Sequence, residues 1–191
     1  MAERTDELAA AALRIVTRDG LPAVTFRAVA AESGWSLGAV QKTFRSKREL
    51  IAATLRYAQI SVSDQVSVEP GRPTLADWLI GLVMATLPLD EDRRSACLIG
   101  IAFADRAPFD PHIAEALAHW DNELRSRLTL LAGRAHAEGE LSRSVDGDTL
   151  ARAVLAFAAG LASQLLYDPI DEDAAHVLVS ATMRALVVPP H

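Results

Sequence analysis

The sequence has one cysteine, two lysines, few aromatic residues and no long apolar run. A single cysteine, Cys97, excludes an intrachain disulfide, and its apolar neighbours in ACLIGIAF indicate a small buried hydrophobic residue rather than a redox centre. No apolar run reaches the roughly 18 residues of a membrane span, and the chain starts with an acidic-basic segment rather than a signal peptide. We therefore expect a cytoplasmic protein that neither crosses a membrane nor is secreted.

The motifs of the common catalytic sites are also missing. The sequence contains no GxSxG elbow, no GxxxxGK[ST] phosphate loop, no GxGxxG and no Cys/His cluster. His112, Glu115 and His119 share one face of an expected helix at metal-like spacing, but without an HExxH motif this pattern is more typical of a solvated face. We predict no enzyme activity, no catalytic residue, no cofactor and no metal site.

Long alternation of apolar and polar residues is absent as well, whereas half of the residues are hydrophobic and Ala and Leu are abundant. This pattern predicts an all-α fold of about nine helices. Residues 4–19 carry apolar side chains at helical spacing, and Thr25, Ser36 and Ser46 each stand as N-caps before a further helix. In the short helix after Ser36 we expect Trp35, Val40 and Phe44 to be buried.

The rest of the chain predicts a second helical domain. Residues 61–73 are polar and contain Pro70, Gly71 and Pro73, which is typical of a joint between domains. A capping box at Thr74 and Asp77 starts the next helix, and SACLIGIAFA, apolar on every face, predicts a helix at the centre of this domain. Further helices are expected over residues 111–138, 146–167 and 170–187. We divide the chain into domains 1–57 and 58–191.

Charge differs between the two parts. Residues 1–57 hold nine Lys or Arg against six Asp or Glu, a net charge of +3, and residues 58–191 have a net charge of −9. Both lysines, Lys42 and Lys47, lie in the first part. A small basic domain on an acidic protein is compatible with a nucleic-acid partner for that domain, but a net charge of +3 is small enough to arise by chance and does not by itself favour one.

Two expected helices flank Glu32-Ser33-Gly34 at the spacing of a helix-turn-helix. The stretch AVTFRAVAAESGWSLGAVQKTFRSKRELI resembles the DNA-binding segment of the tetracycline-repressor (TetR) family, over roughly residues 4–57. The shared positions are Thr25, Val29, Ala30, Gly34, Ser36, Gly38, Phe44, Lys47 and Leu50. Beyond residue 74, FADRAPFDPHIAEALAHWDNELRSRLTLL and AGLASQLLYDP resemble the BetI-type branch of that family.

The resemblance implies a set of DNA-binding residues. Thr25, Arg27 and Lys47 would contact phosphates of double-stranded operator DNA, and helix residues after the turn would face the major groove. Gln41 and Thr43 stand where the family commonly has aromatic residues. The complete predicted DNA-binding set is Thr25, Arg27, Ser36, Leu37, Gly38, Gln41, Lys42, Thr43 and Lys47.

For the second domain the resemblance implies a small-molecule pocket and dimerisation through the last two helices. Independently, Ala156, Ala159, Gly160 and Ser163 give the expected helix 146–167 a face of small residues, which permits close approach of a twofold-related copy. Packing within the same chain is the alternative. The predicted pocket residues, each of which could instead be core, are Trp78, Met84, Phe103, Trp120, Phe157 and Gln164.

The function that follows is a homodimeric, sequence-specific DNA-binding transcriptional regulator, a repressor that a small apolar or amphipathic effector releases from its operator. The alternative is a helical small-molecule-binding protein whose operator recognition is weak or lost, because the family's aromatic residues are missing at Gln41 and Thr43.

Overall fold

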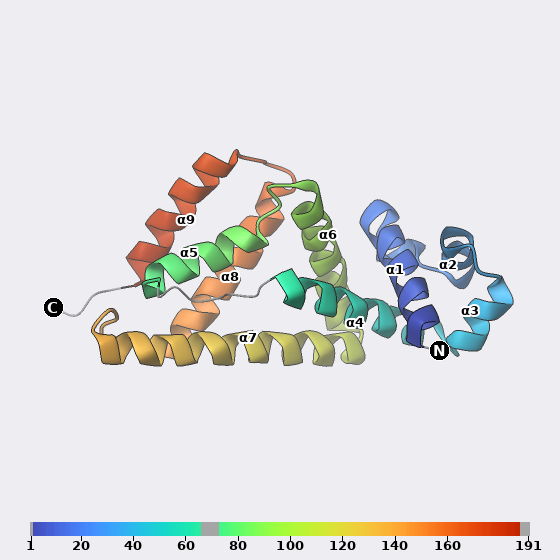
Figure 1. The fold of residues 1–191 in the computed structure, drawn as a ribbon, viewed down its shortest axis with the longest axis horizontal. Helices are drawn as coiled ribbons and strands as arrows, with labels where there is room; N and C mark the ends of the chain where they lie inside the picture. Colours follow the sequence, from blue (N-terminus) through green and yellow to red (C-terminus); the bar gives the residue numbers. More distant parts are fainter. Residues whose placement is uncertain (1, 66–72, 188–191) are drawn as a thin grey trace. The chain divides into compact units, whose positions relative to one another are not determined.

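The computed structural model describes residues 2–65 and 73–187, and within them every regular element is helical (Figure 1). This confirms the all-α prediction. None of the described helices is both long and apolar enough to cross a membrane. The elements are α1 (Ala2–Asp19), η1 (Leu21–Ala23), α2 (Phe26–Ser33), α3 (Leu37–Thr43), α4 (Lys47–Gln65), α5 (Leu75–Thr86), α6 (Glu91–Arg106), η2 (Ala107–Phe109), α7 (Pro111–Glu138), α8 (Gly147–Leu165) and α9 (Glu172–Leu186).

The first helices begin where the sequence predicts their caps. The hydroxyls of Thr25, Ser36 and Ser46 each accept a hydrogen bond from the backbone N–H three residues later, at 3.1, 3.2 and 3.1 Å. Each bond satisfies a donor that a helix start otherwise leaves unpaired. In the capping box of α4, the Glu49 carboxylate reaches the backbone N–H of Arg45, at 2.7 Å.

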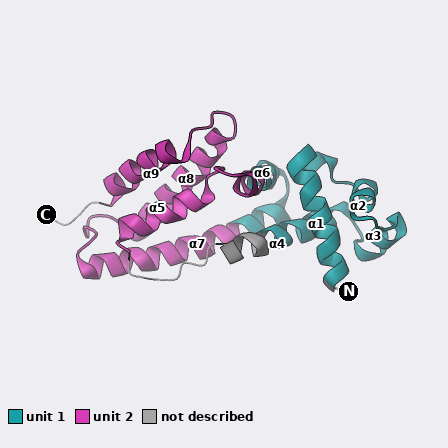
Figure 2. Cartoon of the chain, turned by 45° about the horizontal axis from the view of Figure 1, so that its top comes forward, with its two compact units in different colours: residues 1–67, 98–117 teal, residues 68–97, 118–191 magenta. Residues whose placement is uncertain are grey.

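The chain forms two compact units (Figure 2). The first unit takes in the described residues of 1–67 and 98–117, and the second those of 68–97 and 118–191. Helices α6 and α7 therefore each contribute to both units. The sequence division at residue 58 assigned 98–117 to the second domain, whereas its contacts group it with the first helices. The expected joint over 61–73 falls largely on 66–72, outside the described residues.

One apolar cluster forms the core of the first unit. Helix α1 packs against α2 and α4, and Phe103 of α6 and Ile113 of α7 join the same cluster. Phe103 is fully buried there. The other buried members are Leu8, Ala11, Ala12, Ile15, Val16, Leu21, Val24, Val29, Val40, Phe44, Leu50, Ala53 and Leu55.

The prediction that α6 lies at the centre of the second domain is wrong, because residues 98–106 of α6 belong to the first unit and the helix is partly exposed. Phe103 is its one fully buried residue, and Gly100, Ile101 and Ala104 are exposed. A helix that is apolar all round is normally surrounded by other helices, and that pattern is the basis of the prediction. In the described structure the elements around α6 leave one face uncovered.

In the second unit, α5 packs against α8 and α9. The carboxylate of Glu140 accepts a hydrogen bond from the backbone N–H of Leu75 at 2.7 Å and so caps the start of α5. Helices α7 and α8 approach closely, since a Cβ on Gly147 would lie 3.2 Å from the Cβ of Ala132. The largest fully buried side chains of the second unit are Leu79, Val83, Leu87, Leu141 and Met183.

Candidate nucleic-acid interface, dimer face and effector groove

A glycine turn joins the two helices of the expected helix-turn-helix. Helix α2 ends at Ser33, and Gly34 follows in the left-handed conformation with φ of 75°. A residue with a Cβ is strained in this conformation, which explains the glycine. Helix α3 then starts after the Ser36 cap. The order of helix, tight turn and short second helix is that of a helix-turn-helix.

Helix α3 presents the predicted recognition residues to solvent. Val40 is fully buried on its inner side. Ser36, Gly38, Gln41 and Lys42 are exposed and Leu37 is half-buried. Thr43 is half-buried too, and its hydroxyl donates to the carbonyl of Ala39 at 3.0 Å. The Thr43 hydroxyl thus donates within its own helix, whereas the capping hydroxyls of Thr25 and Ser36 accept from theirs.

The predicted phosphate contacts lie at the starts of α2 and α4. Thr25, Arg27 and Lys47 are all exposed, and the ammonium of Lys47 donates to the carbonyl of Pro22 at 3.3 Å. Arg45 and Arg48 are exposed beside Lys47. Neither arginine is among the predicted DNA-binding residues, although the run Arg45-Ser46-Lys47-Arg48 places both beside Lys47 at a helix start.

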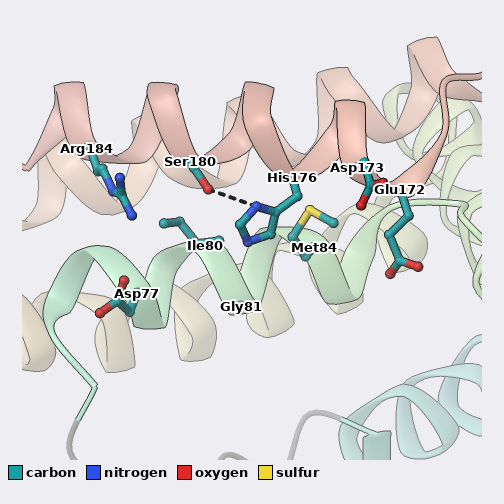
Figure 3. Close-up of a pocket in the computed structure, with 9 residues that line it drawn as sticks. All are labelled: Asp77, Ile80, Gly81, Met84, Glu172, Asp173, His176, Ser180 and Arg184. Carbon is teal, nitrogen blue, oxygen red and sulfur yellow. Dashed lines mark hydrogen bonds between the residues drawn. The ribbon is translucent and has the colours of Figure 1, made fainter.

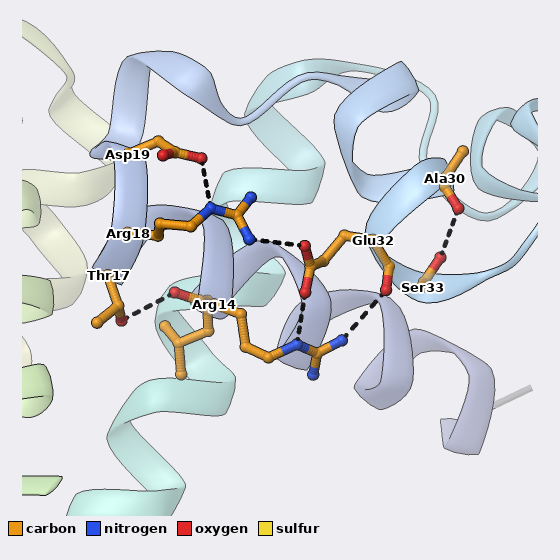
Figure 4. Close-up of polar contacts among 8 residues, drawn as sticks. Arg14, Thr17, Arg18, Asp19, Ala30, Glu32 and Ser33 are labelled. Carbon is orange, nitrogen blue, oxygen red and sulfur yellow. Dashed lines mark hydrogen bonds and ion pairs between the residues drawn. The ribbon is translucent and has the colours of Figure 1, made fainter.

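Ion pairs neutralise two arginines of α1, Arg14 and Arg18 (Figure 4). The Glu32 carboxylate accepts from Arg14 Nε at 2.9 Å and from Arg18 Nη1 at 3.1 Å, and the Glu32 carbonyl accepts from Arg14 Nη2 at 3.4 Å. The two bonds to the carboxylate, first that from Arg14 and then that from Arg18, hold the pKa of Glu32 below its usual value. Glu32 therefore fastens the end of α2 to α1.

Other cations of the first unit have no such partner. In the described part of the chain no carboxylate pairs with them, so their charge is available to an anion. A phosphate backbone is the anion that a cluster of exposed Lys and Arg around a recognition helix fits. Among these cations are Arg27, Lys42, Arg45 and Arg48, which lie in or near the helix-turn-helix.

Trp35 does not occupy the buried position predicted for it. Its side chain is 39% exposed. The indole N–H donates to Glu7 Oε2 at 2.9 Å, and the guanidinium carbon of Arg4 lies 5.6 Å from the ring centroid. A tryptophan in the apolar cluster would need an internal acceptor for its N–H, whereas at the surface of α1 a carboxylate provides one.

The predicted dimer residues lie on an uncovered face of α8. Ala156, Ala159 and Gly160 are exposed and Ser163 is half-buried, and a Cβ built on Gly160 meets no atom within 4 Å. The small residues are therefore not used for packing within the described chain. Helix α9 and the turn before it likewise expose apolar side chains: Tyr167, Ile170, Ala174, Val177, Leu178, Ala181 and Ala185.

A groove of about 510 Å³ runs between α5 and α9 (Figure 3). Ile80 and Met84 supply apolar surface, and Asp77 lies toward the end where Arg184 projects from α9. Its lining residues are Asp77, Ile80, Gly81, Met84, Glu172, Asp173, His176, Ser180 and Arg184.

The six predicted pocket residues do not all lie in one unit. Met84 lines the groove, and Phe103 is buried in the core of the first unit. The other four belong to the second unit: Trp78 and Phe157 are half-buried, and Trp120 and Gln164 are exposed.

The sequence comparisons decide the family. Residues 8–54 match the bacterial regulatory proteins of the tetR family, and residues 75–188 match the C-terminal region of BetI-type transcriptional repressors. The chain belongs to the tetR family. This tetR-family protein is therefore a ligand-responsive, DNA-binding transcriptional regulator, which confirms the class of function predicted from the sequence.

Relatives of this regulator are similar over most of their length. It is 28% identical to the nicotine-responsive transcriptional repressor HdnoR of Paenarthrobacter nicotinovorans, over 88% of this chain and 87% of the relative. A transcriptional regulator from Rhodococcus sp. Rha1 has the same fold with a TM-score of 0.85 and 27% identity, covering 97% of this chain and 99% of that one. A regulator from Saccharomonospora viridis, in complex with choline, has a TM-score of 0.84 and 20% identity, covering 96% of this chain and 97% of that one.

The remaining titratable residues of this tetR-family regulator form no metal cluster within the described ranges. His112, Glu115 and His119 are exposed on α7, and His119 Nε2 lies 3.7 Å from Glu123. The Cys97 thiol donates to the carbonyl of Thr86 at 3.1 Å, and burial raises its pKa. A raised pKa disfavours the reactive thiolate, so the position suits a small hydrophobic residue.

Proposed function

We propose that this regulator binds operator DNA as a homodimer in the cytoplasm and represses transcription until a small organic effector releases it. The observation that carries the proposal is the outward face of α3, where Ser36, Gly38, Gln41 and Lys42 lie exposed above the buried Val40. A helix with this exposure after a helix-turn-helix turn is suited to the major groove.

The side chains divide by chemistry into base reading and phosphate binding. Gln41 can form a bidentate pair with adenine N6 and N7, and Gly38 lets the backbone approach a base edge. Arg27, Lys42, Arg45 and Arg48 carry uncompensated charge for phosphates, and Lys47 joins them by exchanging its Pro22 carbonyl for a phosphate oxygen. Leu37 can contact a thymine methyl group, and the Thr25 hydroxyl can still donate while it caps α2.

Gln41→Ala and Lys47→Ala are expected to weaken binding in different ways. On duplexes that the wild type selects from a random library, Gln41→Ala should relax the preference at one base pair, a loss of about 1–3 kcal/mol of discrimination. Lys47→Ala should weaken binding to operator and random DNA alike and reduce the salt slope by about 1, because it removes one phosphate contact. Fluorescence anisotropy at several salt concentrations measures both quantities.

Arg143→Ala is the matched control, since it removes an exposed cation from the second unit. This variant should leave the base-pair preference and the salt slope unchanged. An equal loss on operator and random DNA for Gln41→Ala would exclude base reading by Gln41. A wild type that selects no sequence at all would favour the alternative, a small-molecule-binding protein without operator recognition.

We propose Ala156, Ala159, Gly160 and Ser163 of α8, together with the exposed apolar residues of α9, as the dimer interface. Their small size permits close helix approach, and the uncovered apolar face needs a partner. A twofold dimer presents two recognition helices, which bind half-sites about one DNA turn, roughly 34–36 Å, apart.

We propose that the effector is apolar or amphipathic and binds in the second unit. The choline complex and the nicotine-responsive repressor among the relatives support a small organic ligand. The α5–α9 groove has a volume in the range of ligand sites and offers Met84 together with charged residues at its ends. Trp78, Trp120, Phe157 and Gln164 are the other proposed contacts.

A ligand found by tryptophan-fluorescence screening is expected to bind more weakly when operator DNA is present. Because coupling between two sites is reciprocal, the factor by which ligand weakens DNA binding equals the factor by which DNA weakens ligand binding. Trp120→Ala should reduce the ligand's effect and leave the DNA affinity of the ligand-free protein near wild type. If titration calorimetry gives equal ligand affinity with and without operator, ligand and DNA binding are not coupled, and the second unit serves dimerisation alone.

A further inference from the structure

Few apolar contacts hold the recognition helix in place. Helix α3 has seven residues, and Val40 is the one that is fully buried. Phe44, just after the helix, is buried in the same cluster. Gly34, in the turn before the helix, would meet no atom within 4 Å if it carried a Cβ. The orientation of α3 therefore depends on what fixes the turn.

Polar contacts to α1 fix this turn on both sides of Gly34. On the α2 side, Glu32 is held by Arg14 and Arg18 (Figure 4). On the α3 side, the indole N–H of Trp35 donates to Glu7 at 2.9 Å, while the ring lies under the guanidinium of Arg4. Trp35 is thus attached to α1 although it is absent from the apolar cluster.

We propose that Arg4, Glu7 and Trp35, the Trp35 cluster, position α3 for base reading. Arg4 and Glu7 are three residues apart on α1 and so lie on one face of a helix that is itself packed against α2 and α4. Trp35 directly precedes Ser36, which caps α3. Holding the indole on α1 therefore sets where α3 begins. This inference rests on the proposed role of α3 in binding DNA.

The chemistry of the cluster is suited to holding an exposed side chain. A hydrogen bond to a charged acceptor is stronger than one between neutral groups. The Nε atom of Arg4 is buried and has no hydrogen-bond partner among the residues that the structure describes. The guanidinium is therefore partly desolvated, and its attraction to the indole ring is correspondingly stronger. Without these contacts, α3 would pivot at Gly34 and its own hydrogen bonds would open more often.

Trp35→Phe and Glu7→Ala test the cluster. Trp35→Phe keeps an aromatic ring and removes the N–H donor, and Glu7→Ala removes the acceptor. Each should lower the ratio of operator to random-DNA affinity about three- to tenfold, which corresponds to one hydrogen bond whose strength is reduced by exposure to solvent. The double variant should lose no more than either single variant, because both remove the same bond. The salt slope should stay at its wild-type value, since no phosphate contact is lost.

Asp6→Ala is the matched control, because it removes a neighbouring exposed carboxylate of the same helix. It should leave the affinity ratio unchanged. Unchanged ratios for Trp35→Phe and Glu7→Ala would overturn the proposal. An equal loss on both DNAs with a smaller salt slope would overturn it too, because that result indicates direct contact of the cluster with DNA.

Hydrogen exchange of the free protein tests the cluster without DNA. The amides of Ala39, Val40 and Phe44 should exchange faster in both variants, and that of Val29 in α2 should not change. Unaltered exchange in α3, or faster exchange throughout the first unit, contradicts a positioning role. If the wild type selects no DNA sequence, the DNA-binding proposal is refuted. The exchange rates of the α3 amides then still show whether the Trp35 cluster holds α3 in place.

Discussion

Replacing Gly160 by tryptophan is expected to convert the protein from dimers into monomers. Gly160 is exposed on α8, and a Cβ at this position has open space around it, so the single chain can accept the ring. Two helices that approach through small residues cannot accept it, because the ring separates their backbones. Size-exclusion chromatography with light scattering measures the mass, and circular dichroism checks that the variant remains helical.

The loss of the dimer should also abolish tight operator binding. A dimer binds two half-sites at once, and linking two binding events typically raises affinity by about 10²–10⁴-fold. Gly160→Trp is therefore expected to weaken operator binding at least about 100-fold while its α3 residues are intact. Gly133→Trp is the matched control, since Gly133 is an exposed glycine of α7 with equally open surroundings. If Gly160→Trp stays dimeric, the interface lies elsewhere on the protein.

The parts of the fold that depend on neighbouring residues in the chain could be predicted. Thr25, Ser36 and Ser46 cap their helices because a hydroxyl three residues before a backbone N–H reaches it wherever the helix lies in the protein. Gly34 is needed for a left-handed turn, a local requirement as well. The helix-turn-helix and its outward face follow from these local signals together with the buried Val40.

Features set by contacts between distant segments could not be predicted. Glu32 pairs with Arg14 and Arg18, 18 and 14 residues away, and nothing in the sequence marks those arginines as neutralised. Trp35 has a hydrophobic ring, but an acceptor 28 residues away, Glu7, keeps it at the surface. For the same reason, periodicity could identify Phe103 as a buried type of residue but could not say in which core it lies.

Phe103→Ala is expected to destabilise the first unit by about 3–5 kcal/mol, because it removes a large, fully buried aromatic side chain and leaves a cavity. Such a loss is a large share of the roughly 5–15 kcal/mol that stabilises a typical domain. Urea unfolding should show a lower midpoint, and operator binding should weaken as the helix-turn-helix unfolds. Ile101→Ala, on the exposed side of α6, is the control and should change stability little.

Phe103→Ala also distinguishes between two roles for Phe103, that of a core residue and that of a pocket residue, which the sequence suggested. A pocket wall lies partly open to its ligand, so its truncation should lower ligand affinity and change the unfolding free energy little. A core residue gives the opposite result, with the loss concentrated in stability, and Phe103→Leu should recover most of it because much of the buried apolar volume returns. Normal stability of Phe103→Ala combined with weakened effector binding would show that Phe103 faces a ligand site. The full burial of Phe103 beside helices α1 and α4 leads us to expect the stability loss.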